Sequence, residues 1–223
     1  MDEAVMLQTS TQVQDYVLCS GCEQLLCNRG EDWILERLAV GVASPLYYAL
    51  GGLEPILNEA DFKTYSVVGN PEFDVEKITH FALGVFFKMA AHEWTIGKHK
   101  RRFQFGSYLG SIGSYLLGCG PFPAHCALMF CIHPPTDAPK RIALPYEWKT
   151  DGSRTYGFIL IGLEFVLSLD KQMPPWHRDL CFVNGSSRFV IVANVTERLM
   201  NETTERIIRA GHVKGKLAKK LLP

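Results

Sequence analysis

The chain lacks an excess of charge of either sign. It has 23 basic and 23 acidic residues among 223, so its formal net charge is zero. Proteins that neutralise several nucleic-acid phosphates usually show an overall or regional excess of Lys and Arg. The composition as a whole therefore gives no support to nucleic-acid binding, and only local basic clusters remain. The hydrophobic share of 47% is ordinary for a folded protein that buries a core without disulfide staples.

Long hydrophobic runs and a leader pattern are also missing. The longest apolar run, residues 156–169, is interrupted by Glu164 and is shorter than the roughly 20 residues that a spanning helix needs. The first residues are acidic and polar, whereas a secretory signal has a basic stretch followed by an apolar core. Seven cysteines, an odd number, indicate thiols or metal ligands rather than a disulfide framework. We expect a cytoplasmic protein with no membrane partner.

Common enzyme signatures are absent as well. The sequence has no phosphate-binding loop, no dinucleotide-binding glycine motif, no His-Glu-x-x-His and no serine nucleophile elbow. The segment PPWHRDLC places His177, Asp179 and Cys181 close together. Because a catalytic Cys and His meet through the fold rather than through adjacency, this spacing gives little support to a Cys–His nucleophile.

The most informative feature that is present is a group of three cysteines near the start, Cys19, Cys22 and Cys27. A Cys-x-x-Cys turn can place both sulfurs at about 2.3 Å from one Zn²⁺. A tetrahedral structural site needs four ligands, and no second Cys-x-x-Cys follows at zinc-ribbon spacing. The sequence therefore predicts a structural zinc held by Cys19, Cys22 and two ligands from elsewhere.

Four residues are candidates for the missing ligands. Residues two apart on a strand share a face, so Cys131 and His133 could point at one ion, whereas Cys126 would face the opposite side. Each candidate also has an ordinary interpretation, because free cysteines pack as small hydrophobes and the helix dipole favours a histidine near a helix C-terminus. The candidates are Cys27, His92, Cys131 and His133.

A redox role for the Cys-x-x-Cys pair is the alternative to zinc. Redox pairs of this kind lie where a strand runs into a helix N-terminus, which lowers the thiol pKa. The acidic residues Glu31 and Asp32 predict that the first helix begins well downstream of Cys22. This spacing disfavours the redox alternative.

A basic cluster follows the longest predicted helix, and a basic tail over residues 214–220 ends the sequence. The helix dipole alone favours such residues beyond a helix C-terminus. The cluster is also the best candidate for contacts with nucleic acid, which would be electrostatic and salt-sensitive. Its members are Lys98, Lys100, Arg101 and Arg102.

The hydrophobic periodicity predicts an α+β fold. A helical layer would cover one face of an antiparallel sheet built from the C-terminal half. We expect a cysteine knuckle segment over residues 1–30 and a single α+β domain over 31–223 packed against it. The predicted helices are 31–41, 75–94, 105–117 and 196–210, the β-prone runs are 126–132, 142–144, 156–169 and 188–195, and residues 44–70 are mostly loop with one or two short elements.

The segments LCSGCEQLL, GEDW, HFALGVFFKMAAHEW and YGFILIGLEFVLSL resemble a group of uncharacterised bacterial proteins. The resemblance spans roughly residues 16 to 183, and its opening motif is Cys-x-x-Cys-Glu followed by Gly-Glu-x-Trp. In that pattern Cys19 and Cys22 are the recurring thiols, and Cys27 is particular to this chain. The resemblance implies a bacterial cytosolic protein with one integrated domain and no assigned activity.

Together these patterns favour a zinc-binding interaction protein with a protein or nucleic-acid partner. The alternative is a nuclease-like or other hydrolase that uses the zinc knuckle as a structural brace, although the Asp-His and Asn-His elements of such enzymes are not visible.

Overall fold

The structure is a computed structural model that describes residues 17–38, 44–96, 99–134, 142–150, 153–171, 173, 175–184 and 188–193. All of them belong to one compact unit, Val13–Ala193. The predicted helix over 196–210, the basic tail and Lys98 lie outside the described residues. Within the described part, no helix has the length and apolar character needed to cross a membrane.

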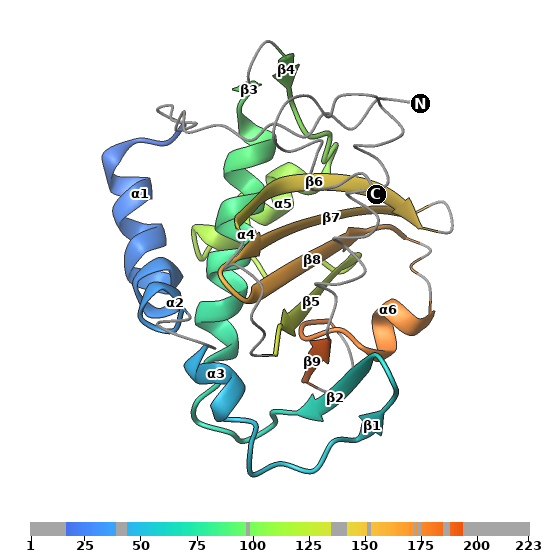
Figure 1. The fold of residues 1–223 in the computed structure, drawn as a ribbon. Helices are drawn as coiled ribbons and strands as arrows, with labels where there is room; N and C mark the ends of the chain where they lie inside the picture. Colours follow the sequence, from blue (N-terminus) through green and yellow to red (C-terminus); the bar gives the residue numbers. More distant parts are fainter. Residues whose placement is uncertain are drawn as a thin grey trace, which may run out of the picture. The chain divides into compact units, whose positions relative to one another are not determined.

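A seven-stranded sheet forms the centre of this unit, in the order β1-β2-β9-β5-β8-β7-β6 (Figure 1). Neighbouring strands are antiparallel except β5 and β9, which pair in parallel. The predicted α+β fold is confirmed, with two strands added from the stretch that the sequence predicted as mostly loop. The strands are β1 (Leu57–Asn58), β2 (Phe62–Ser66), β5 (Cys126–Ile132), β6 (Ile142–Thr150), β7 (Ser153–Leu160), β8 (Leu163–Leu169) and β9 (Phe189–Ala193).

The β-prone run over residues 156–169 folds as a hairpin rather than as one strand. Leu160 pairs with Leu163 across a two-residue loop. The loop residues Ile161 and Gly162 have φ angles of 41° and 85°. Positive φ at both central residues is the pattern of a type I′ turn, which matches the twist of the flanking strands. Isoleucine is not a residue that marks such a turn, so Gly162 was the one turn signal at these two positions.

Helix α4 (Val75–Ala91) packs its apolar side on the sheet and agrees closely with the predicted helix. It begins because the Asp74 side chain accepts a hydrogen bond from the Lys77 backbone N–H at 3.0 Å. The ring centroids of Phe81 and Phe165 are 5.4 Å apart across the helix–sheet interface. Such aromatic contacts contribute about 0.5–1.5 kcal/mol beyond area burial. Three shorter helices are α3 (Pro45–Tyr48), α5 (Tyr108–Leu116) and α6 (Pro175–Asp179).

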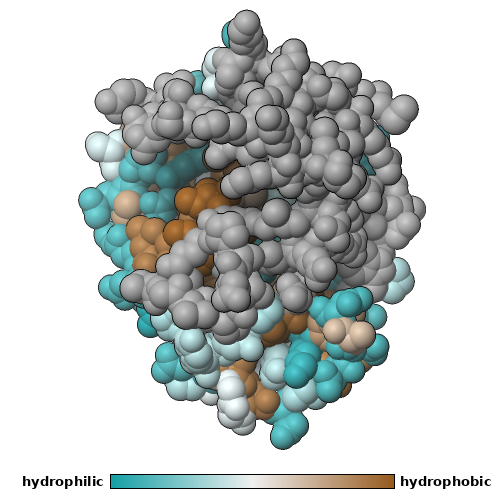
Figure 2. Space-filling view, viewed as in Figure 1, coloured by the Kyte–Doolittle hydropathy of each residue, from teal (hydrophilic) through white to brown (hydrophobic). Residues whose placement is uncertain are grey.

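Residues 20–36 form one unbroken helical stretch on the side of α4 away from the sheet (Figure 1). It consists of α1 (Ser20–Leu26), a π-helical turn η1 (Cys27–Glu31) and α2 (Asp32–Glu36). The sequence-based helix start at residue 31 is therefore wrong. Residue 30, where we expected the knuckle segment to end, lies inside η1. On the face drawn in Figure 2 the described surface near α1 and α2 is mostly hydrophilic, with hydrophobic residues showing beside it.

Candidate metal centre

The two cysteines of the Cys-x-x-Cys motif lie together at the start of α1. Cys19 is the N-cap, with extended backbone angles (φ −71°, ψ 159°), and its sulfur accepts a hydrogen bond from the Cys22 backbone N–H at 3.4 Å. Helical residues three apart share one face. Cys19 is exposed and Cys22 is half-buried. Both thiols therefore occupy the same accessible end of the helical stretch.

The two thiols also influence each other's pKa. The backbone N–H of Cys22, and then its side chain, lower the pKa of Cys19. The hydrogen bond to the Cys19 sulfur, and then the charge on that sulfur, raise the pKa of Cys22. Cys19 is thus the more readily ionised of two interacting sulfurs, and the thiolate is the form of cysteine that binds metals.

Helix α4 holds this helical stretch in place through an ion-pair bridge. The Lys88 ammonium lies 2.8 Å from Glu23 Oε2 and 2.9 Å from Glu31 Oε1. The Leu26 side chain fills the space over Gly84, with Leu26 Cδ2 3.4 Å from where a β-carbon at Gly84 would lie. Because both charged and apolar contacts fix the residues just after Cys22, the position of the thiol pair relative to α4 is set.

Cys27 is not brought to this pair. It lies five residues beyond Cys22, about 7.5 Å along a helix axis at 1.5 Å per residue. Its thiol donates a hydrogen bond to Glu31 Oε2 at 3.4 Å. Burial, followed by the Glu31 carboxylate, raises the pKa of Cys27. This position suits an ordinary packed thiol better than a ligand shared with Cys19 and Cys22.

The other predicted ligands lie at separate places. His92 is the extended C-cap residue of α4, and its ring contacts the Trp94 ring at 5.2 Å. His133 follows β5, with its Nε2 3.1 Å from Glu164 Oε2. Cys131 on β5 is buried, and burial raises its pKa well above the ordinary value. Within the described ranges, no three His, Cys, Asp or Glu side chains gather as a metal site would require.

The side chains near β5 follow the predicted alternation between sheet faces. Cys126 packs in the core with Leu128 and Phe130. Ala127 and Met129 belong to a separate apolar cluster on the other face. Cys131 lies two residues beyond Met129 on the same strand, so it shares that face. Glu164, which pairs with Cys131 in the strand register, also accepts a hydrogen bond from the Tyr146 hydroxyl at 3.0 Å. Sequence reasoning missed Glu164 as the partner of His133, because it appeared only as an interruption in an apolar run.

The His177–Cys181 segment does not carry the features of an activated nucleophile. His177 Nδ1 lies 2.9 Å from the Ser168 hydroxyl oxygen, and both side chains are buried. The Cys181 thiol donates to the Arg178 carbonyl at 3.3 Å. Burial raises the pKa of Cys181 to about 11, whereas a nucleophilic cysteine needs a lowered pKa.

The predicted basic cluster lies on a small antiparallel hairpin, β3 (Trp94–Ile96) and β4 (His99–Arg101). The Lys100 ammonium lies 3.0 Å from Glu93 Oε1, and both side chains are largely exposed. Arg102 is exposed just after β4. Lys98 and the Arg101 side chain lie outside the described part of the chain. The hairpin thus presents basic groups to solvent, one of them paired with an acid.

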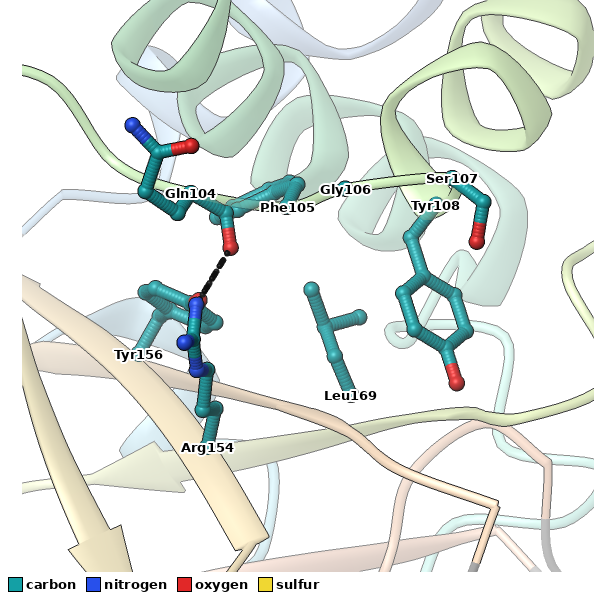
Figure 3. A pocket seen from close by; sticks show the side chains of 8 residues that line it. All are labelled: Gln104, Phe105, Gly106, Ser107, Tyr108, Arg154, Tyr156 and Leu169. Carbon is teal, nitrogen blue, oxygen red and sulfur yellow. Dashed lines mark hydrogen bonds between the residues drawn. The ribbon is translucent and has the colours of Figure 1, made fainter.

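A cavity of about 230 Å³ lies between the start of α5 and strands β7 and β8 (Figure 3). Arg154 Nη1 and the Tyr156 hydroxyl both donate to the Gln104 carbonyl, at 3.2 and 2.9 Å. Leu169 and Tyr108 line its other side. None of the residues that the sequence singled out lines this cavity. Two of its polar side chains, Arg154 and Tyr156, fasten the loop before α5 to β7.

Neither a family model, nor a curated protein, nor a solved structure matches this chain. The resemblance to bacterial proteins that share the Cys-x-x-Cys-Glu motif therefore stays a prediction.

Proposed function

We propose that this chain is a zinc-binding interaction protein in which Cys19 and Cys22 supply two of the metal ligands. The observation that carries the proposal is their placement on one accessible helical turn, with the Cys19 sulfur accepting the Cys22 N–H at 3.4 Å. Zinc prefers thiolate sulfur, and a pair on one turn can chelate it. The zinc would be structural, and its chemistry would be to join α1 to whatever carries the other two ligands.

Metal analysis of the purified protein tests this proposal. The double variant Cys19→Ser plus Cys22→Ser should lose the bound zinc, because a serine hydroxyl is a poor ligand for this ion. Cys119→Ser is the matched control, since Cys119 is also an exposed free thiol. We expect the control to keep its zinc. Equal zinc content in wild type, double variant and control would refute the proposal.

A thiol–disulfide couple at the same pair is the second candidate function. The specific observation in its favour is that Cys19 caps α1. The sequence argument against a redox role relied on a helix start well downstream, and that start is wrong. If the pair is redox-active, mild oxidation by a small disulfide should produce a Cys19–Cys22 disulfide. Mass spectrometry would detect it as a loss of two hydrogens in wild type that is absent from the double variant.

Nucleic acid is the partner class that we propose for the basic hairpin. Lys100 and Arg102 are exposed and lie two residues apart in sequence, and such groups bind phosphates through salt-sensitive electrostatic contacts. Retention on a polyanion resin should weaken in the variant Lys100→Glu plus Arg102→Glu. Retention that ignores this charge reversal would count against nucleic acid and leave a protein partner.

A further inference from the structure

Among the described residues, the zinc site of the proposed function has only two ligands, Cys19 and Cys22. Structural zinc is almost always held by four ligands in a tetrahedron. Cys19 and Cys22 supply two, and among the described residues no third His, Cys, Asp or Glu side chain completes a group with them. The remaining ligands must come from elsewhere.

The rest of this chain is poor in accessible thiols that could complete a site of sulfur ligands. All seven cysteines lie in the described part, and three of them, Cys126, Cys131 and Cys181, are buried. The stretches outside it contain no cysteine. Only His99 and His212 have histidine side chains that lie outside the described part. One chain therefore offers two accessible thiols at one place and no second thiol pair to match them.

A second copy of the chain provides what is missing. Two copies related by a two-fold axis present the same surface to each other, so the axis can pass through one zinc ion. Each copy would then give Cys19 and Cys22, and the four sulfurs would form a Cys₄ tetrahedron. The accessible end of α1 carries both thiols, so the ion can be reached from outside the chain.

The local charges are compatible with this arrangement. Four thiolates around one Zn²⁺ leave an excess of negative charge at the site. Glu23 is the acidic residue in the first turn of α1, and the Lys88 ammonium at 2.8 Å offsets part of its charge, because the same ammonium also pairs with Glu31 at 2.9 Å. The positive end of the helical stretch in each copy also favours negative charge there. The excess charge would therefore be partly offset in each copy.

We infer that two copies of this chain share one zinc ion through their Cys19 and Cys22 thiolates. This inference rests on the proposed zinc-binding function. It goes beyond that function by naming the partner as a second copy of the same chain and the ligand set as four sulfurs.

Native mass spectrometry of the full chain tests the inference together with zinc analysis. Wild type with zinc should be a dimer with one zinc per two chains. The chelator EDTA should convert it to monomer, and added zinc should restore the dimer. The double variant Cys19→Ser plus Cys22→Ser should stay monomeric when zinc is added, whereas the control variant Cys119→Ser should still form the dimer. The EDTA arm uses the unaltered chain, so it is independent of how well the variants fold.

The possible failures are distinguishable. A monomer with one zinc bound through Cys19 and Cys22 would overturn the shared site and leave the proposed function standing. A dimer that persists unchanged in EDTA would show that zinc is not the bridge. Absence of zinc, or a Cys19–Cys22 disulfide in freshly purified protein, would overturn both the shared site and the proposed function.

Discussion

Gly30 is the position where one added methyl group should do most damage to the packing of the N-terminal helical stretch. A β-carbon at Gly30 would lie 2.6 Å from the Lys77 carbonyl oxygen and 2.7 Å from the Phe81 nitrogen. Both are backbone atoms of α4, so they cannot turn away as the end of a flexible side chain could. Overpacking of this kind costs about 3 kcal/mol at the upper end of the usual range. Replacing a helical glycine by alanine returns about 1 kcal/mol, so Gly30→Ala should lose about 2 kcal/mol.

Urea denaturation of wild type, Gly30→Ala and Gly21→Ala measures this difference. Gly21 lies in α1, and a β-carbon there would meet no atom within 4 Å. Gly21→Ala should therefore keep the wild-type stability or gain up to about 1 kcal/mol. If Gly30→Ala proved as stable as Gly21→Ala, the close contact of η1 with α4 would be wrong, and with it the fixed position of the thiol pair.

Three further changes test other parts of the structure. Burial lowers the pKa of His80, so below about pH 6.5 the unfolded chain binds a proton at this residue more readily than the folded chain does. The free energy of unfolding should therefore fall as the pH drops, by up to about 1.4 kcal/mol per pH unit. In the variant His80→Gln this fall should be less steep. Ile161→Asn should raise the unfolding free energy by about 1 kcal/mol, because asparagine tolerates the positive φ of the β7–β8 turn better than isoleucine does. An unchanged or lower stability would contradict that turn. Lys88→Met leaves Glu23 and Glu31 without their shared cation and should lower the urea midpoint by more than Lys100→Met, whose Glu93 pair is largely exposed.

The strongly periodic parts of the fold could be predicted from the sequence. The predicted strand over residues 126–132 has the observed bounds of β5, and the long helix differs from α4 only at its end. The helix ends at Ala91 because His92 turns to an extended conformation, although the apolar spacing continued to Trp94. Where the spacing of apolar residues matches the buried face over many residues, the sequence alone was sufficient to predict the type of element and most of its bounds.

The start of the first helix could not be predicted, for two physical reasons. Its N-cap is Cys19, whose sulfur takes the part that Ser, Thr, Asp or Asn oxygen usually plays. Its buried positions Leu26, Gly30 and Ile34 are four residues apart throughout. In an ordinary α-helix, residues spaced by four drift gradually around the helix and would not all face α4. The wider π-helical turn η1 keeps these three residues on the side that contacts α4. The error matters because the helix start decides where both candidate thiols lie.

The Cys19–Cys22 pair itself could be predicted from spacing, but its surroundings could not. Cys131 and His133 fit the sequence pattern of ligands, yet His133 meets Glu164, which is thirty-one residues away along the chain. Such a partner follows from the β5–β8 register rather than from any local pattern. Ligand candidates that lie far apart in sequence therefore need the strand pairing before they can be judged.

The most direct measurement of the central claim is an X-ray absorption spectrum at the zinc edge of the purified full chain. We predict four sulfur neighbours at about 2.3 Å, because Cys19 and Cys22 of two copies would surround the ion. A first shell made only of nitrogen and oxygen neighbours at about 2.0–2.2 Å would contradict the claim that these thiols hold the metal.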